Sequence, residues 1–205
     1  DGGLTMKNFV IVGRPNSGKT LFALNFAGYL GVRTVNITFN SLDGLLFCRE
    51  YELTEAKKEL CSAVQHKTRC VQSMILKIRL GKALVNFKLT DTCGVAENIS
   101  SEENLRRGMA QTLSFMRSAD FIIHIFDLMT VKSAGLPAEG VDWEIFRYGM
   151  VRNRYVLLVN KIDLPAAKQN LSNLTTAVQG AGVIPVSARY NYGFKEVKTY
   201  VARNI

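Results

Sequence analysis

The sequence predicts an α/β protein with a doubly wound, mostly parallel sheet and helices on both of its faces. Three observations support this fold class. The runs 121–126 and 155–159 are almost continuously apolar, as in strands that are buried on both faces. After residue 84, predicted strands alternate with predicted helices, which is typical of parallel sheets. A chain of 205 residues is also long enough for one sheet covered by helices.

The first third of the chain contains strand and helix patterns of unequal strength. The last pattern is a helix that begins near Thr54, a candidate N-cap, and the polar side of this helix carries Glu55 and Lys58. We predict no element for the stretch 45–53, which follows a turn. The predicted elements are a strand Phe9–Val12, a helix Leu21–Ala27, a short strand Thr34–Phe39, a turn 40–44 and a helix Thr54–Val64.

A hairpin is predicted next. The runs Met74–Leu80 and Leu84–Thr90 have the composition of strands, and Gly81-Lys82 between them is typical of a tight turn. We expect three leucines to anchor this pair to the core, namely Leu80, Leu84 and Leu89.

The remainder of the chain alternates helix and strand. Ser100 or Ser101 is expected to cap the first helix. His124 lies inside a buried strand, so we interpret it as a hydrogen-bonded core histidine rather than a catalytic one. The predicted elements are the helix Glu102–Arg117, the strand Phe121–Phe126, a loop 130–140, the helix Trp143–Met150, the strand Tyr155–Val159, the helix Gln169–Val178, the strand Val183–Val186 and the helix Phe194–Arg203.

The composition predicts a cytoplasmic protein with one domain, residues 6–205. No apolar run is long enough to cross a bilayer. Residues 1–5 lack the pattern of a signal peptide and are interpreted as an expression remnant ahead of Met6. The four cysteines form no C-x-x-C pair, which favours free thiols in a reducing compartment over a disulfide framework or a zinc site.

Positive charge is concentrated in one stretch of the chain, within a formal net charge of +9. No acidic residue occurs between Leu60 and Thr90. Such a field would attract ribosomal RNA, another acidic partner or an anionic membrane surface. An equally good interpretation is a solvated strand face, whose charges prevent sheets from aggregating edge to edge. The basic residues of this stretch are Lys67, Arg69, Lys77, Arg79, Lys82 and Lys88.

Residues 13–20 form the most informative motif. They lie between a predicted strand and a predicted helix, the setting in which G-x-x-x-x-G-K-[ST] is a phosphate-binding P-loop. The glycines allow backbone N–H groups to point inward, and the helix N-terminus adds partial positive charge. Lys19 would reach the terminal phosphates, and the Thr20 hydroxyl would ligate Mg²⁺. The predicted phosphate site is Gly13, Arg14, Pro15, Asn16, Ser17, Gly18, Lys19 and Thr20.

The sequence Asn160-Lys161-Ile162-Asp163 predicts which base is bound. Guanine presents two adjacent donors to which an acceptor-only carboxylate such as Asp163 can pair, whereas adenine does not. Against ATP that carboxylate would stay unpaired, which is costly. Asn160 can tie this loop to the P-loop, and the stem of Lys161 can pack over the ring. By itself, the four-residue pattern is equally compatible with ordinary loop chemistry.

The sequence Asp91-Thr92-Cys93-Gly94 ends a predicted strand and fits a sensor of the terminal phosphate. The Asp91 carboxylate can hold Mg²⁺, and Gly94 offers a backbone N–H that approaches a phosphate closely because there is no side chain. A plain turn at the end of a strand would look similar.

These motifs together resemble those of the Ras-like P-loop GTPases, and within them the bacterial TrmE-, Era-, Der- and ferrous-iron-transporter-type G domains. The segments GRPNSGKT, DTCG, NKID and SAR occur in the order of that family and cover Phe9 to Ile205. The resemblance implies GTP or GDP at the P-loop, Mg²⁺ at Thr20 and Asp91, and guanine at Asn160, Lys161 and Asp163. It also implies that the last segment, Ser187, Ala188 and Arg189, lies near the base.

Departures from the family pattern affect the catalytic residues. Cys93 replaces the usual proline or alanine, and Arg189 replaces the more common lysine or leucine. The switch threonine that would ligate Mg²⁺ is assigned to Thr68, with Thr54 and Thr38 as weaker candidates. Because the interval from Thr20 to Thr68 is long for the family, residues 32–64 are predicted to include an insertion that contacts a partner.

Hydrolysis is expected to be slow. Val95 follows Gly94 where Ras-type enzymes carry the glutamine that orients water. The resemblance suggests that Asn16 accompanies a K⁺ ion that stabilises the transition state, although Asn16 could equally brace the loop. The catalytic candidates are therefore Lys19, Asn16, Thr68 and Gly94.

Three functions fit these motifs. The first is a GTPase switch that hydrolyses GTP slowly, and that pairs with a second copy in a nucleotide-dependent way. The second is a GTP-dependent module that binds RNA or ribosomes. The third is the cytosolic G domain of a membrane transporter. An ATPase would leave Asp163 without a role.

Overall fold

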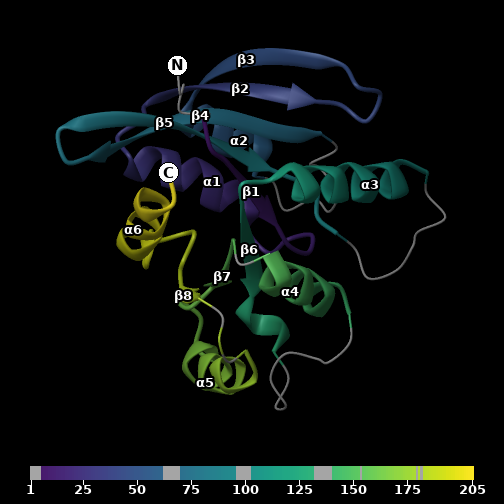
Figure 1. Ribbon diagram of the computed structural model, residues 1–205, viewed down its shortest axis with the longest axis vertical. Helices are drawn as coiled ribbons and strands as arrows, with labels where there is room; N and C mark the ends of the chain where they lie inside the picture. Colours follow the sequence, from purple (N-terminus) through teal and green to yellow (C-terminus); the bar gives the residue numbers. More distant parts are fainter. Residues whose placement is uncertain are drawn as a thin grey trace.

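The computed structural model describes residues 6–61, 70–95, 103–131, 140–152, 154–178, 180 and 182–205. Within them, eight strands form one sheet in the order β3-β2-β4-β5-β1-β6-β7-β8, with helices on both faces (Figure 1). The strands are β1 Asn8–Val12, β2 Thr34–Asn40, β3 Leu46–Glu52, β4 Val71–Leu80, β5 Ala83–Asp91, β6 Phe121–Asp127, β7 Tyr155–Asn160 and β8 Val183–Pro185. The helices are α1 Lys19–Tyr29, α2 Leu53–Leu60, α3 Glu103–Ser118, α4 Val141–Arg152, α5 Ala167–Ala177 and α6 Phe194–Arg203, with a short 3-10 helix at Leu128–Thr130.

The predicted fold class is confirmed by the strand pairing. Strands β5, β1, β6, β7 and β8 pair with one another in parallel, while β4, β2 and β3 extend the sheet by antiparallel pairs. Every side chain of β7 is buried, as expected of a strand that is covered on both faces. Because the parallel strands end at the same edge of the sheet, the loops that follow β1, β5 and β7 are brought together there.

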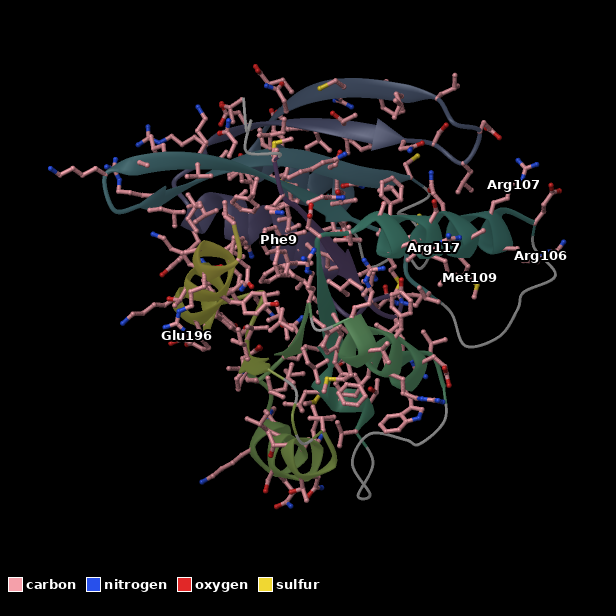
Figure 2. All side chains as sticks on the ribbon, in the orientation of Figure 1. Phe9, Arg106, Arg107, Met109, Arg117 and Glu196 are labelled. Carbon is pink, nitrogen blue, oxygen red and sulfur yellow. The ribbon has the colours of Figure 1, made fainter. Side chains whose placement is uncertain are left out.

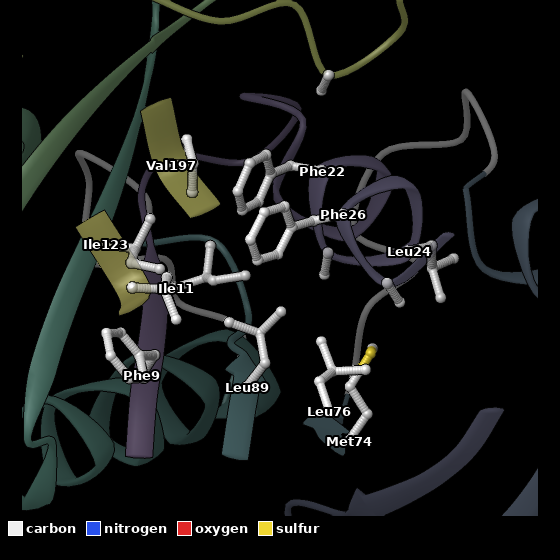
Figure 3. Close-up of a cluster of buried hydrophobic side chains, with 14 of the residues drawn as sticks. Phe9, Ile11, Phe22, Leu24, Phe26, Met74, Leu76, Leu89, Ile123 and Val197 are labelled. Carbon is white, nitrogen blue, oxygen red and sulfur yellow. The ribbon is translucent and has the colours of Figure 1, made fainter. Parts of the chain in front are cut away.

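Two hydrophobic cores lie on opposite faces of the sheet, because successive side chains of a strand alternate between faces. In β1, Phe9 and Ile11 enter one core, and Val10 and Val12 enter the other. The first core is shown in Figure 3, where aromatic side chains of α1 lie over the strands. The rings of Phe22 and Phe26 are stacked 5.5 Å apart, and Phe194 of α6 meets both rings edge-on.

Strand β3 is a structural element that the sequence did not predict. It pairs antiparallel with β2, from Thr34 opposite Glu52 to Asn40 opposite Leu46, and forms the edge of the sheet. Only Tyr51 of its seven residues is buried. Exposure of both faces of an edge strand removes the apolar alternation that would have identified it.

Several predicted helix boundaries need correction. Helix α2 begins at Leu53, so Thr54 lies inside it and is not the N-cap. The predicted end of this helix at Val64 and the predicted caps Ser100 and Ser101 lie outside the described residues. Helix α5 begins at Ala167, ahead of the expected Gln169. Of the helices in the described ranges, none combines the length and apolar character needed to cross a bilayer.

The predicted β4–β5 hairpin is confirmed, but the predicted anchoring role is wrong for one of the three leucines. Leu89 is fully buried and Leu80 packs against the first core. Leu84 is 61 % exposed. It lies opposite Arg79 and therefore shares the solvent-facing side of the hairpin with that arginine.

Candidate functional site

The loop between β1 and α1 has the backbone of a glycine-dependent turn. Gly13 and Gly18 adopt positive φ angles of 144° and 97°. A Cβ atom at Gly13 would collide with the carbonyl oxygen of Ile125, and one at Gly18 would collide with the side-chain amide of Asn160. Both positions therefore require glycine for space as well as for conformation. Helix α1 begins directly after this loop, so its free N–H groups face the loop.

Lys19 and Thr20 meet the carboxylate of Asp91 at the start of α1. The Thr20 hydroxyl donates a hydrogen bond of 2.6 Å to Asp91 Oδ2. The ammonium group of Lys19 is buried and donates to the Arg14 carbonyl at 2.7 Å. Burial lowers the pKa of Lys19, and the nearby Asp91 carboxylate opposes this shift.

A divalent cation fits the chemistry of this pair. Asp91 Oδ1 is buried and has no hydrogen-bond partner in the part of the chain that the structure describes. Burial raises the pKa of Asp91 to about 6, against the opposing effects of Lys19 and Thr20. A hard cation such as Mg²⁺ binds carboxylate and hydroxyl oxygens, so it would satisfy the unpaired oxygen and favour the ionised form.

The segment after β5 is pressed against the P-loop. The Val95 N–H donates to the Gly13 carbonyl at 3.1 Å. A Cβ atom at Gly94 would lie only 2.5 Å from the backbone nitrogen of Pro15, so glycine is needed for this approach. Burial raises the pKa of the Cys93 thiol to about 11, which makes Cys93 a packing residue rather than a nucleophile.

Asn160 joins three loops, as the sequence predicted for its contact with the P-loop. This buried side chain donates to the Ser17 carbonyl at 2.8 Å and accepts from the Ala188 N–H at 2.9 Å. Asn25 of α1 donates to the Ala188 carbonyl at 2.6 Å. Two buried amide side chains therefore fix the geometry between the P-loop, the end of β7 and the segment after β8.

The other predicted base contacts lie around this junction. Lys161 has a positive φ of 72° and forms an ion pair with Asp127. Asp163 follows in the same turn and is half-buried. Ser187 is fully buried. Arg189 is exposed, and its guanidinium lies 5.4 Å from the centre of the Tyr190 ring.

The structure brings together the candidates from all four motifs, through the contacts Thr20–Asp91, Pro15–Gly94 and Asn160 with both Ser17 and Ala188. Thr68, the candidate switch threonine, lies outside the described residues, as do Lys67 and Arg69. The weaker candidates Thr38 and Thr54 lie in β2 and α2.

Sequence reasoning missed two carboxylates that contact motif residues. Asp127 ends β6 and pairs with Lys161. Asp142, in the first turn of α4, pairs with Arg14 at 3.0 Å and also contacts His124. His124 is fully buried with both ring nitrogens partnered, as predicted for a core histidine. The end of a parallel strand was a usable signal for Asp127, whereas Asp142 had none.

Curated relatives match part of this chain, although no family model does. The tRNA modification GTPase MnmE of Chlorobium luteolum is 32 % identical over 117 residues, which are 57 % of this chain and 24 % of that protein. The GTPase Obg of Alkaliphilus oremlandii is 26 % identical over 136 residues, which are 60 % of this chain and 30 % of that protein. The chain thus spans about a quarter of the length of MnmE.

Solved structures show the same fold over nearly the whole chain. A structure of Era with MgGDPNP and a 16S ribosomal RNA fragment has a TM-score of 0.65 and 20 % identity, and covers 97 % of this chain and 57 % of that one. Aquifex aeolicus Era bound to GDP·AlF₄⁻ has a TM-score of 0.61 and 17 % identity, with coverages of 98 % and 57 %. The G domain of the Thermotoga maritima iron transporter FeoB has a TM-score of 0.51 and 16 % identity, with coverages of 97 % and 98 %.

Proposed function

We propose that the chain is a G domain of the Ras-like P-loop GTPases, of the Era and TrmE type, and that it binds GTP with Mg²⁺ and hydrolyses it to GDP and phosphate as a conformational switch. The observation that carries this proposal is the junction at Asn160, whose two hydrogen bonds join the P-loop to both predicted base loops. The cycle is assigned to the cytoplasm, the compartment that the sequence predicts.

Binding is assigned to the four motif loops. The N–H groups of the P-loop and the ammonium group of Lys19 would bind the phosphates, and Thr20 and Asp91 would hold Mg²⁺, with Thr68 as an additional predicted ligand. The metal would neutralise charge on the phosphates. Gly94 would present its N–H to the terminal phosphate, and Asp163 would pair with guanine.

Base recognition is tested by Asp163→Asn. An amide has one donor and one acceptor where the carboxylate has two acceptors, so it repels one of the two guanine donors and suits xanthine instead. Affinity for fluorescent GDP should fall by about 100-fold or more, while affinity for the xanthine analogue should rise. Asp43→Asn, at an exposed loop carboxylate, is the control. Unchanged GDP affinity in Asp163→Asn, or tighter binding of ATP than of GTP by the unmodified protein, would contradict the assignment.

Potassium stimulation is the catalytic part of the proposal. The Asn16 side chain is exposed and makes no hydrogen bond within the described part of the chain, which supports a role in binding a cation rather than bracing the loop. Phosphate release should be faster in K⁺ than in Na⁺, and Asn16→Ala should remove the difference. Asn191→Ala is a matched control, because Asn191 has the same φ of 61° and is also exposed. Equal rates in the two salts would refute this role for Asn16.

A second candidate function is GTP-dependent binding of RNA through the basic residues of the β4–β5 hairpin. Lys77, Arg79 and Lys88 share the uncovered face of the hairpin, and Lys82 is exposed in its turn. A groove of about 930 Å³ on this side is lined by Lys77, Lys88 and hydroxyl and amide side chains of β2 and β4, together with apolar residues such as Met6, Leu30 and Ile75, and no acidic residue is among the described lining residues. Such groups bind phosphate backbones. The name of MnmE and the RNA in the Era structure add support.

Charge reversal separates the two candidates. In the triple variant Lys77→Glu, Arg79→Glu, Lys82→Glu, an RNA-binding module should lose RNA affinity and keep GTP turnover. The matched control reverses three exposed cations elsewhere, Lys168→Glu, Lys195→Glu and Arg203→Glu. Equal losses in both triple variants would indicate non-specific attraction and contradict a dedicated RNA surface.

Two further expectations from the sequence stay predictions. The first is that residues 32–64 include an insertion that contacts a partner, and the exposed side chains of Leu45, Leu46 and Phe47 beside the sheet edge support it. The second is nucleotide-dependent pairing of two copies. Sedimentation velocity with GDP and with a non-hydrolysable GTP analogue tests pairing, and one sedimentation coefficient in both states at every concentration would refute it.

A further inference from the structure

A row of four polar side chains leads from the interior of the protein to the P-loop. Tyr155 of β7 contacts His124 Nδ1 at 2.7 Å, and His124 Nε2 contacts Asp142 Oδ1 at 3.0 Å. The other oxygen of Asp142 forms an ion pair of 3.0 Å with Arg14 Nε. Tyr155, His124 and Asp142 are all buried, so the row is shielded from water.

The partners determine how the protons are arranged. An ionised carboxylate only accepts hydrogen bonds, so the proton on His124 lies on Nε2 and is donated to Asp142. Nδ1 is then placed to accept a hydrogen bond from the Tyr155 hydroxyl. Burial, and secondly the charge of Asp142, raises the pKa of Tyr155 well above its ordinary value, so this hydroxyl stays a donor.

The backbone elements around the row hold it in place. Asp142 lies in the first turn of α4, where the helix dipole stabilises its negative charge. A Cβ atom at Gly149 of α4 would collide with the ring of Tyr155, so this helix lies directly against the ring. Tyr155 is therefore fixed by packing on one side and by His124 on the other.

The row ends at the residue that holds the P-loop lysine. The side chain of Arg14 forms the ion pair with Asp142, and the backbone carbonyl of Arg14 accepts the hydrogen bond of 2.7 Å from Lys19 Nζ. Holding the Arg14 side chain restricts the backbone of the same residue, whose carbonyl also accepts from the Ser17 N–H at 3.3 Å, and so restricts the position of the Lys19 ammonium group. Groups that are held before a ligand arrives lose less freedom on binding, which increases affinity.

We propose that Tyr155, His124 and Asp142 are positioning residues for the nucleotide site, which hold Arg14 and thereby pre-arrange Lys19 for the phosphates. The inference rests on the proposed nucleotide binding. It differs from a purely structural role, in which these residues would only satisfy one another in the core and nucleotide affinity of the folded protein would not depend on them.

The test begins with GDP affinity of Asp142→Asn, which keeps the side-chain shape and removes the charge. We expect Kd to rise by about tenfold, since the loss of a charge-assisted contact is typically of that order. KM for GTP should rise with Kd, while kcat changes by less than about twofold, because none of the three residues touches a reacting atom. Glu144→Gln, an exposed carboxylate on the same helix, is the control and should leave Kd unchanged.

A double-mutant cycle shows whether the effect passes through Arg14. In an Arg14→Ala background, Asp142→Asn should change Kd by less than about twofold, because its partner is already absent. An undiminished effect in that background would overturn the proposal, as would an unchanged Kd in Asp142→Asn.

Tyr155→Phe keeps the test decisive if Asp142→Asn does not fold. It retains the ring that packs against Gly149 and removes only the hydroxyl group, and we expect Kd to rise by about two- to fivefold. An unchanged Kd in Tyr155→Phe would then refute the positioning role. Failure of the unmodified protein to bind GDP would instead refute the proposed function itself, so the two failures are distinguishable.

Discussion

The substitution Asn160→Ala tests the junction between the motif loops. It would leave the Ser17 carbonyl and the Ala188 N–H buried without the partners that now lie 2.8 and 2.9 Å away. Each unsatisfied buried group costs about 1–3 kcal/mol, so the free energy of unfolding should fall by about 2–6 kcal/mol. That is a large part of the stability of a typical domain, about 5–15 kcal/mol.

Urea unfolding without nucleotide measures this loss, and Asn170→Ala provides the matched control. Asn170 makes a single, partly buried hydrogen bond to the Leu128 carbonyl, so its replacement should cost about 1 kcal/mol. Asn160→Asp is informative too, because the carboxylate can still accept from Ala188 but would repel the Ser17 carbonyl. A cost for Asn160→Ala no larger than that for Asn170→Ala would refute the reasoning that this side chain holds the loops together.

Three more outcomes follow from the packing and burial of single residues. Gly94→Ala should slow phosphate release by about tenfold or more while GDP affinity changes little. The reason is that the new methyl group must push the segment after β5 away from Pro15. An unchanged rate of phosphate release would contradict this. In urea unfolding, Leu89→Ala should lower the free energy of unfolding by about 2–5 kcal/mol, and Leu84→Ala by less than about 0.5 kcal/mol, because of the two only Leu89 is buried. Equal losses of stability would be inconsistent with the register of the hairpin. Burial raises the pKa of Asp91 to about 6, so the folded protein without metal binds a proton at Asp91 more tightly than the unfolded chain does. This proton binding contributes about 3 kcal/mol to the free energy of unfolding below about pH 4, and the contribution is lost as the pH rises through 6. Asp91→Asn in EDTA should abolish that part of the pH dependence of unfolding, and identical pH profiles for the two proteins would exclude the predicted shift.

The parallel half of the sheet could be predicted because its signals are local. Strands buried on both faces leave continuous apolar runs, and the P-loop requires glycines at fixed spacing. Gly13 and Gly18 have the positive φ angles that such a loop demands. Convergence of the motifs followed from a general rule, since loops at the carboxyl ends of parallel strands share one edge.

The antiparallel side was predicted less well, for identifiable reasons. Strand β3 is exposed on both faces and therefore carries no periodic pattern. The error at Leu84 was avoidable. Leu84 and Leu89 are separated by an odd number of positions, so in one regular strand they must point to opposite faces.

The polar row behind the P-loop could not be predicted from local patterns. Its members lie on β6, β7, α4 and the P-loop, and only their packing brings them together. Composition signals report which residues are buried, whereas partners of a buried polar group depend on register and on helix placement. The sequence therefore predicted no role for Asp142.

The tight contact between Gly149 of α4 and the Tyr155 ring gives a glycine outside the four motifs an influence on nucleotide affinity. Glycine inside a helix costs about 1 kcal/mol relative to alanine, so a stabilising change would be expected there on propensity alone. Adding one methyl group would instead displace the ring, and with it the histidine and the carboxylate beyond. A random mutagenesis screen for weakened nucleotide binding should thus recover this glycine alongside the motif residues, although it has no polar side-chain atom.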